Sequence, residues 1–249
     1  MEIGAQLYTV REFCRTPEDL ARTLTKIAEM GYQTVQVSGT CDWKGEWLRE
    51  QLTKNGLRCP VTHMAKDRLI HDLPGVMADH RAIGCPYVGM GYWAFDESRD
   101  MGYEAFLSTW PQVGRALREG GFRFLFHNHD REFIHIDGKP ILRRLAELIP
   151  PEDMGFILDT YWIQFAGADP AAWIEDLRGR VPCLHLKDCA WGHKMAVLGE
   201  GNMNFDRILK AAEYAGTEYL LVEQDDCGGE DPFACLRRSY QFLRARGLA

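Results

Sequence analysis

Residues 122–133 read Phe-Arg-Phe-Leu-Phe-His-Asn-His-Asp-Arg-Glu-Phe, an alternating apolar run that ends in two histidines. Successive side chains of a β-strand point to opposite faces, so Leu125, His127 and His129 share one face of this run. The phenylalanines share the other face. The stretch therefore predicts a buried strand with two imidazoles on one side of its carboxyl end.

Three later apolar segments also end in a residue that can bind a metal ion. They are residues 155–159, ending in Asp159, residues 181–185, ending in His185, and residues 218–223, ending in Glu223. Each segment has the length and composition of a short buried strand. Together with the first stretch they predict a mononuclear metal centre built from four parallel strands.

Strand and helix patterns alternate along the whole chain of 249 residues. Strands are expected at 2–9, 32–38, 57–63, 86–91, within 122–133, and at 155–159, 181–185 and 218–223. The helices expected between them include 43–54, 103–119, 138–148 and 204–215, and helices also start at Thr16-Pro17, Asp169-Pro170 and Asp231-Pro232. No linker interrupts the pattern. It predicts one α/β domain over residues 1–249, a (β/α)8 TIM barrel rather than a doubly wound sheet.

Composition narrows the class of protein. With 46% hydrophobic and 26% charged residues and a net charge of -7, the chain is typical of a soluble globular protein without a nucleic-acid groove. It has no apolar run of about 20 residues and no leader pattern, so we expect a cytoplasmic protein that does not enter a membrane. The eight cysteines are scattered without a Cys-x-x-Cys pair, which predicts reduced thiols.

The polar residues fall where a barrel places its functional groups, at the carboxyl ends of strands. Two residues before them on the same faces lie Leu125, Ile157, Cys183 and Leu221, an apolar layer beneath a polar rim. Singly, His185 is explained as a core histidine and Asp159 as a loop cap. Converging imidazoles and carboxylates instead indicate one divalent ion, Mn²⁺, Zn²⁺, Co²⁺ or Fe²⁺, in preference to Ca²⁺.

Several motifs resemble the sugar phosphate isomerase/epimerase group of the xylose isomerase-like TIM-barrel superfamily. They are Gln6-Leu7-Tyr8-Thr9-Val10-Arg11, His127-Asn128-His129-Asp130, Leu158-Asp159-Thr160-Tyr161-Trp162, His185-Leu186-Lys187-Asp188, Gly199-Glu200-Gly201-Asn202 and Val222-Glu223-Gln224-Asp225. The resemblance spans nearly the whole chain. It implies a divalent metal held by Glu, Asp, His and Glu from strands five to eight, with both glutamates exchanging protons beside a metal-bound carbonyl.

One ligand departs from that pattern. Asp159, His185 and Glu223 match the last three, whereas the strand-five glutamate falls at His127. His127 can bind metal, and His129 is either the ligand itself or a substrate contact. With Glu223 as one base, the second acid or base is to be found among His127, His129, Glu132 and His63, although Glu132 is expected in a solvated loop.

We expect a carbohydrate pocket at the barrel mouth. Aromatic residues suited to sugar faces follow several strands: Tyr8, Trp43, Tyr92, Trp93, Tyr161, Trp162 and Trp191. Expected substrate contacts are Gln6, Tyr8, His63, Trp162, Lys187 and Glu200. Lys187 either contacts a substrate oxygen and assists catalysis, or forms a salt bridge with Glu223 or Glu200.

The resemblance implies a metal-dependent isomerase or epimerase in carbohydrate metabolism, acting on a sugar, keto-sugar or polyol. A lyase or dehydratase acting on a keto-sugar or keto-inositol is the alternative that the missing strand-five glutamate favours. A non-catalytic sugar-binding barrel is a third hypothesis. The DNA-repair branch of the superfamily is disfavoured, because Trp162 replaces a metal-binding histidine of that branch. Homo-oligomerisation is left open.

Overall fold

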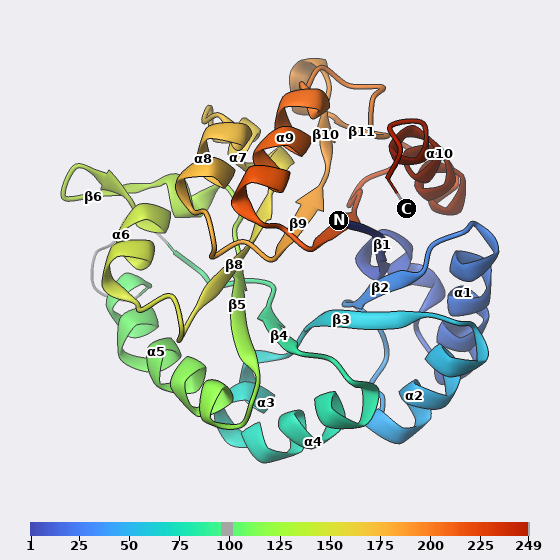
Figure 1. Ribbon diagram of the computed structural model, residues 1–249, viewed down its shortest axis with the longest axis horizontal. Helices are drawn as coiled ribbons and strands as arrows, with labels where there is room; N and C mark the ends of the chain where they lie inside the picture. The colour runs from blue at the N-terminus through green and yellow to red at the C-terminus, as the bar shows by residue number, and fades with distance from the viewer. Residues whose placement is uncertain (96–101, 249) are drawn as a thin grey trace.

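The computed structural model describes residues 1–95 and 102–248. Within these residues, eight parallel strands close into a barrel in the order β1-β12-β9-β8-β5-β4-β3-β2, surrounded by helices (Figure 1). The strands are β1 (Glu2–Gln6), β2 (Thr34–Val37), β3 (Arg58–His63), β4 (Tyr87–Met90), β5 (Arg123–His127), β8 (Gly155–Asp159), β9 (Cys183–Leu186) and β12 (Tyr219–Val222). The predicted (β/α)8 barrel is confirmed.

Helices cover the outside of the barrel. They are α1 (Pro17–Glu29), α2 (Gly45–Lys54), α3 (Lys66–His71), α4 (Leu73–Ile83), α5 (Tyr103–Glu119), α6 (Ile141–Leu148), α7 (Thr160–Phe165), α8 (Pro170–Asp176), α9 (Phe205–Ala215) and α10 (Pro232–Arg244). Short hairpins pair β6 (His135–Ile136) with β7 (Lys139–Pro140) and β10 (Asp188–Cys189) with β11 (Met195–Ala196). The sequence did not predict α3 and α7, because six residues are too few for a helical period to stand out.

The expected helix signals operate as local chemistry demands. The side chain of Thr16 accepts the backbone N–H of Asp19, and Pro17 occupies the first turn of α1. Gly84 and Gly216 adopt the left-handed conformation that ends α4 and α9. The predicted helix 138–148 begins only at residue 141, and its last apolar residue, Leu148, is 56% exposed rather than buried.

Side-chain alternation divides the apolar residues into two cores. Val61, Tyr87, Leu125, Ile157, Cys183 and Leu221 form a cluster inside the barrel. The larger core, which includes Phe124 and Phe126, lies between the strands and the helices. The predicted parity of the strand ending in His127 is therefore confirmed, and so is the apolar layer beneath the polar rim.

The first predicted strand is wrong beyond Gln6. Residues Leu7–Phe13 form a 3-10 helix, and the Gln6 side chain accepts the backbone N–H of Tyr8 at 3.0 Å. Leu7 is fully buried in this turn, so the buried and exposed residues continued to mimic strand alternation. Smaller shifts occur elsewhere: β9 continues to Leu186, and β12 ends one residue before Glu223.

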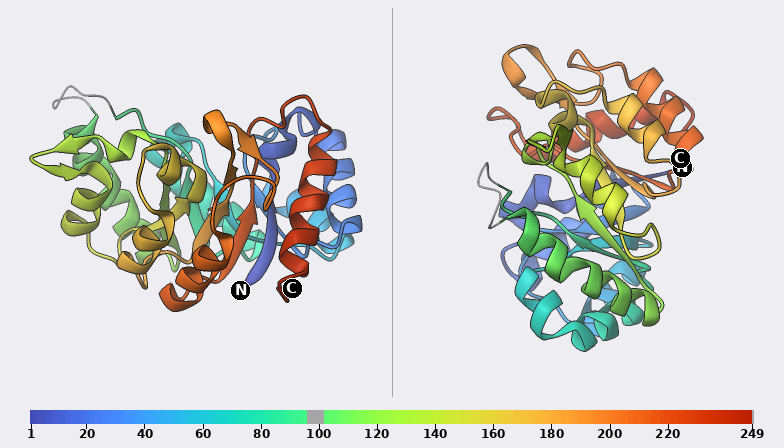
Figure 2. Two further views of the ribbon diagram at one scale, coloured as in Figure 1. Left: turned by 90° about the horizontal axis from the view of Figure 1, so that it is seen from above. Right: turned by 90° about the vertical axis from the view of Figure 1, so that its left-hand side faces the viewer.

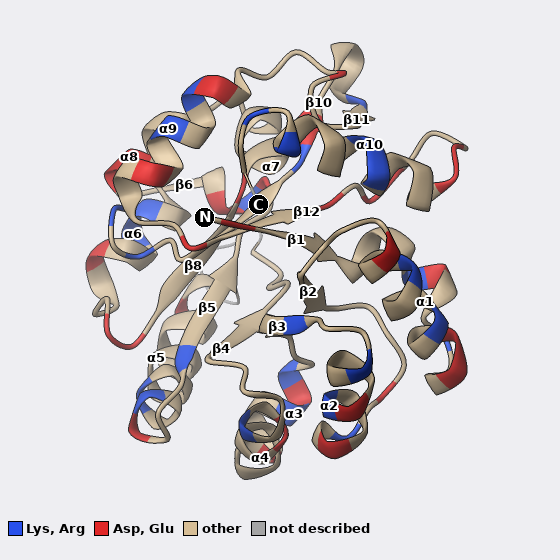
Figure 3. Ribbon diagram, turned by 45° about the vertical axis from the view of Figure 1, so that its right-hand side comes forward, with Lys and Arg blue, Asp and Glu red and all other residues tan. Residues whose placement is uncertain are grey.

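The surface of the barrel separates charged from apolar residues. Lys, Arg, Asp and Glu lie mainly on the outer helices and loops (Figure 3). The two termini lie close together at one end of the barrel (Figure 2). Among the described residues, no helix has the length and apolarity needed to cross a membrane. All eight cysteines are free thiols, as predicted.

Candidate metal centre

Four neighbouring strands deliver four buried ligand candidates to one end of the barrel. His127 ends β5, Asp159 ends β8, His185 lies near the end of β9, and Glu223 follows β12. Parallel register aligns these ends: Asp159 is opposite His185, and Leu221 is opposite His185 on the other side. One ligand atom from each of the four residues lies within 4.8 Å of all the others. The predicted convergence is present in the structure.

The atoms that face one another in this cluster lack ordinary partners. His185 Nδ1 lies 2.9 Å from Glu223 Oε2 and 3.9 Å from Asp159 Oδ2. None of these three buried atoms makes a hydrogen bond of acceptable geometry within the described part of the chain. Buried polar atoms without partners are costly, and a divalent cation would satisfy all three together. The residues present therefore fit a metal ion.

Hydrogen bonds on the far side of each imidazole orient it for ligation. His185 Nε2 lies 2.6 Å from Gln36 Oε1. An amide oxygen only accepts, so the ring proton is on Nε2 and the lone pair of Nδ1 points into the cluster. His127 Nδ1 lies 3.4 Å from the carbonyl of Ile157, which likewise leaves Nε2 unprotonated. Sequence reasoning missed Gln36, although a polar residue within an apolar strand was a usable signal.

Lys187 is almost fully buried among three carboxylates. Its Nζ lies 3.0 Å from Asp159 Oδ2, 2.9 Å from Glu223 Oε2 and 2.9 Å from Asp225 Oδ2. The salt bridge to Glu223 that the sequence offered as one alternative is confirmed. Sequence reasoning assigned no role to Asp225, although it shares the parity of Glu223. Three carboxylates face one ammonium group, so negative charge is in excess in the ionised cluster, as a site for a dication requires.

Opposing influences set the charge of this cluster. Burial disfavours the carboxylate of Glu223, but Lys187 and His185 outweigh it and hold its pKa well below the usual range. Burial raises the pKa of Asp159, and it raises the pKa of Asp225 to about 6. Burial also opposes charge on Lys187, yet the neighbouring carboxylates raise its pKa. Glu223 is thus ionised and able to accept a proton or bind a cation.

Three further imidazole contacts surround the cluster. The ring centroid of His127 lies 4.4 Å from His185, 4.7 Å from His129 and 5.3 Å from His63. Burial lowers the pKa of His127 and His63 well below the usual value and that of His129 to about 4. All three are neutral at pH 7, the form that binds metal ions and accepts protons. His129 stands outside the four-ligand cluster, against Trp162 and Tyr92.

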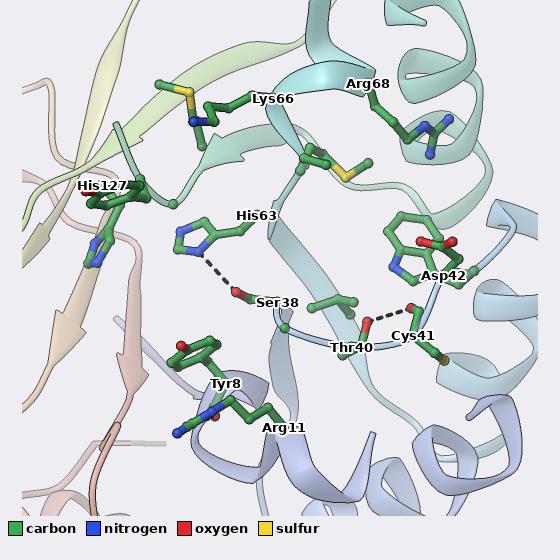
Figure 4. A pocket seen from close by; sticks show the side chains of 18 of the residues that line it. Tyr8, Arg11, Ser38, Thr40, Cys41, Asp42, His63, Lys66, Arg68 and His127 are labelled. Carbon is green, nitrogen blue, oxygen red and sulfur yellow. Dashed lines mark hydrogen bonds between the residues drawn. The ribbon is translucent and has the colours of Figure 1, made fainter. Parts of the chain in front are cut away.

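A cavity of about 1210 Å³ opens above the cluster (Figure 4). Most expected substrate contacts line it: Tyr8, His63, Trp162 and Lys187, together with His127, His129 and Glu223. Two do not. Gln6 is buried as the cap of the 3-10 helix, and Glu200 is exposed and paired with Arg238 at 2.9 Å. Among the aromatic candidates, Trp93, Tyr161 and Trp191 are also absent from the lining, and Trp191 is 85% exposed.

The Glu200 motif contributes backbone instead of a side chain. Asp188 Oδ1 accepts the N–H groups of Cys189 and Met203, and its Oδ2 accepts those of Gly199 and Gly201, over 2.7 to 3.3 Å. The carboxylate therefore fixes the loop that follows β9 close to the cavity. Gly201 is required here, because an added Cβ would lie 2.4 Å from Asp188 Oδ1.

We expect Asp188→Ala to lower the free energy of unfolding by on the order of 3 kcal/mol, because buried N–H groups lose a charged acceptor. Urea denaturation followed by circular dichroism measures the change. Exposed Glu213→Ala is the control and should change stability little. A loss for Asp188→Ala no larger than that of the control would show that the loop does not depend on this carboxylate.

Glu132 is buried rather than solvated, which corrects the sequence expectation. Its Oε2 accepts the backbone N–H of His129 at 2.7 Å, and Oε1 has no partner in the described structure. It does not line the cavity. Burial raises the pKa of Glu132 to about 8. Glu132 thus supports the backbone of His129, and no direct contact with a substrate in the cavity is indicated.

The raised pKa of Glu132 predicts a pH dependence of stability. The native carboxyl keeps its proton up to about pH 8, whereas in the unfolded chain it ionises near 4.5. Its contribution is therefore complete below pH 4.5 and is lost as the pH rises through 8. Between pH 5 and 8, Glu132→Gln should lose roughly 2 kcal/mol less stability than the wild type. Urea titrations at each pH test this, with exposed Glu213→Gln as the control; parallel curves for Glu132→Gln and wild type would refute it.

The fold and site define a (β/α)8 barrel with a candidate metal centre at the carboxyl ends of its strands. The chain belongs to the xylose isomerase-like TIM barrel family, whose model matches residues 24–246. Among curated proteins, it is similar to "Inosose dehydratase" of Bacillus cereus (strain AH820), with 21% identity over 155 residues, or 54% of this chain and 51% of the relative. "Inosose dehydratase 2" of a second Bacillus cereus strain matches at the same identity and coverage. The chain thus spans about half the length of these relatives.

Solved structures agree over nearly the whole chain. A sugar phosphate isomerase/epimerase from Parabacteroides distasonis matches with a TM-score of 0.83 and 21% identity, covering 98% of this chain and 93% of the other. An L-ribulose 3-epimerase matches at 0.78 and 17%, covering 98% and 94%. A probable 3-DHS dehydratase from Bacillus anthracis matches at 0.76 and 14%, covering 98% and 99%. At these identities the likeness establishes the fold.

Proposed function

We propose that the protein is a divalent-metal-dependent isomerase or epimerase that acts on a sugar, keto-sugar or polyol. The observation that carries this proposal is the cluster of four buried ligand atoms within 4.8 Å, three of them without hydrogen-bond partners, at the floor of a large cavity. His127, Asp159, His185 and Glu223 would hold the ion. The sugar isomerases and epimerases among the similar folds support the assignment.

A bound divalent ion would supply Lewis-acid polarisation of a substrate carbonyl, which acidifies the neighbouring C–H. Glu223 is the base in this proposal, because Lys187 and His185 keep its carboxylate ionised in a site that excludes water. The second proton transfer falls to His129 or His63. Each lines the cavity and has one buried ring nitrogen without a hydrogen-bond partner in the described structure.

Solvent exchange tests the proposed proton transfer. Purified protein loaded with Mn²⁺ is incubated in D₂O with a panel of aldoses, ketoses and keto-inositol, and the recovered sugars are examined by NMR. We expect deuterium at the carbon next to the carbonyl of a substrate, together with its isomer. Glu223→Gln should slow exchange at least about 100-fold, and exposed Glu213→Gln should not. Absence of exchange with every sugar would refute an isomerase.

A dehydratase is the second candidate, favoured by the identity of one residue. The strand that carries a glutamate in related epimerases carries His127 here, so Glu223 is the only glutamate of the ligand cluster. The curated relatives are inosose dehydratases, which supports the same alternative. Loss of water from a keto-inositol or keto-sugar in the same NMR experiment would favour it. A protein that neither turns over a substrate nor binds metal would match the non-catalytic barrel.

A further inference from the structure

The cavity extends well beyond the candidate metal centre. At about 1210 Å³ it exceeds the roughly 300–1,000 Å³ typical of pockets for drug-sized ligands. One end is formed by His63, His127 and Glu223. The other end, which we call the outer bay, is lined by Cys41, Asp42, Trp43, Lys44, Trp47 and Arg68. In Figure 4, His63 and His127 lie on one side and Cys41, Asp42 and Arg68 on the other.

The walls of the outer bay are held in place by the fold. Trp43 and Trp47 pack against the main core while remaining partly exposed, so each presents part of its indole to the cavity. Arg68 is anchored by Asp72 at 2.7 Å and Asp79 at 3.1 Å. The bay is therefore a preformed surface and needs no rearrangement to accept a ligand.

The bay combines two kinds of recognition chemistry. The indoles offer flat apolar faces, while Asp42, Lys44 and Arg68 at its edge offer both hydrogen-bond donors and acceptors. A hydrocarbon tail would leave these charged groups without partners, and a phosphate would lie beside the carboxylate of Asp42. A sugar ring has apolar C–H faces and a rim of hydroxyl groups, and it matches both features.

We propose that the outer bay is a second sugar-binding subsite, so that the substrate is a glycoside of at least two rings. One ring lies at the candidate metal centre, and the next lies against Trp43 and Trp47. The placement of the first ring depends on the proposed function. The subsite itself depends only on the cavity and its lining. This arrangement makes the second ring a source of binding energy that a free monosaccharide lacks.

Calorimetric titration with unreacted sugars tests the subsite. The probes are D-glucose, methyl β-glucoside, phenyl β-glucoside, cellobiose, maltose and sucrose. At least one disaccharide should bind about tenfold more tightly than either single-ring sugar and more tightly than the phenyl glucoside. Trp47→Ala should remove this preference and leave single-ring binding unchanged. Trp191→Ala, which alters an exposed indole outside the cavity, should retain it.

A second variant guards against an effect of Trp47→Ala on folding. Asp42 and Lys44 have exposed side chains, so their double replacement by alanine should keep the thermal stability and still reduce the preference for the disaccharide. Equal affinity for one and two rings, or no binding of any sugar, overturns the subsite. Equal affinity for the phenyl glucoside overturns its assignment to a sugar.

Repeating the titrations with Mn²⁺ and with EDTA separates the two proposals. A disaccharide preference that persists in EDTA and is lost in Trp47→Ala supports the subsite even where the metal-dependent function fails. Metal binding at the centre without any disaccharide preference leaves the proposed function standing and refutes the subsite.

Discussion

Asp159→Asn is expected to weaken binding of Mn²⁺ at least about 100-fold, because even the outer partners of metal ligands are worth about 10 to 100-fold in affinity. The substitution is selective. Oδ1 of Asp159 accepts the N–H of Trp162 at 3.0 Å and begins α7, and the amide oxygen of asparagine can keep that bond. The amide NH₂ then replaces Oδ2, the atom that faces Lys187 and His185. The local fold is kept while one ligand is lost.

A matched control exists in the same chain. Asp169 begins α8 with the same type of cap, accepting the N–H of Ala171 at 3.0 Å, and it lies outside the cavity lining. Asp169→Asn should bind Mn²⁺ as the wild type does. Calorimetric titration of metal-free protein measures both variants. Wild-type affinity in Asp159→Asn would remove Asp159 from the ligand set.

Lys187→Met should lower the free energy of unfolding of the metal-free protein by about 3 to 5 kcal/mol. The substitution leaves Asp159, Glu223 and Asp225 buried together without the ammonium group that now lies about 3 Å from each. A divalent ion supplies positive charge to the same carboxylates. Saturating Mn²⁺ should therefore recover more stability in Lys187→Met than in the wild type.

Urea denaturation in EDTA and in Mn²⁺ provides the comparison. Lys210→Met, on the exposed face of α9, controls for the loss of a surface charge and should behave as the wild type under both conditions. An equal loss of stability with and without Mn²⁺ would show that Lys187 contributes packing only. That outcome would also separate the lysine from the charge balance of the candidate metal centre.

The order of elements was predictable because each depends on nearby residues. The alternation around Leu125 and Phe126 placed one inside the barrel and the other beneath the helices. The first strand failed where a side chain intervened. Gln6 caps a 3-10 turn through its own amide, and alternating burial alone cannot reveal such a contact.

The ligand cluster was predictable for a different reason. Parallel strands of a barrel end at the same rim, so residues far apart in the sequence had to converge. The supporting groups were not predictable, because their partners come from distant elements. Gln36 of β2 orients His185, and burial of Glu132 depends on packing around a loop. Glu200 shows the converse: its motif serves the loop through backbone N–H groups, which the residue type does not disclose.

The most direct test of the central claim is anomalous scattering from crystals of protein supplied with Mn²⁺, combined with metal analysis of the same sample. The proposal predicts one ion per chain, within bonding distance of His127, Asp159, His185 and Glu223, with His129 outside the coordination sphere. Absence of bound metal, or an ion held elsewhere in the chain, would contradict it.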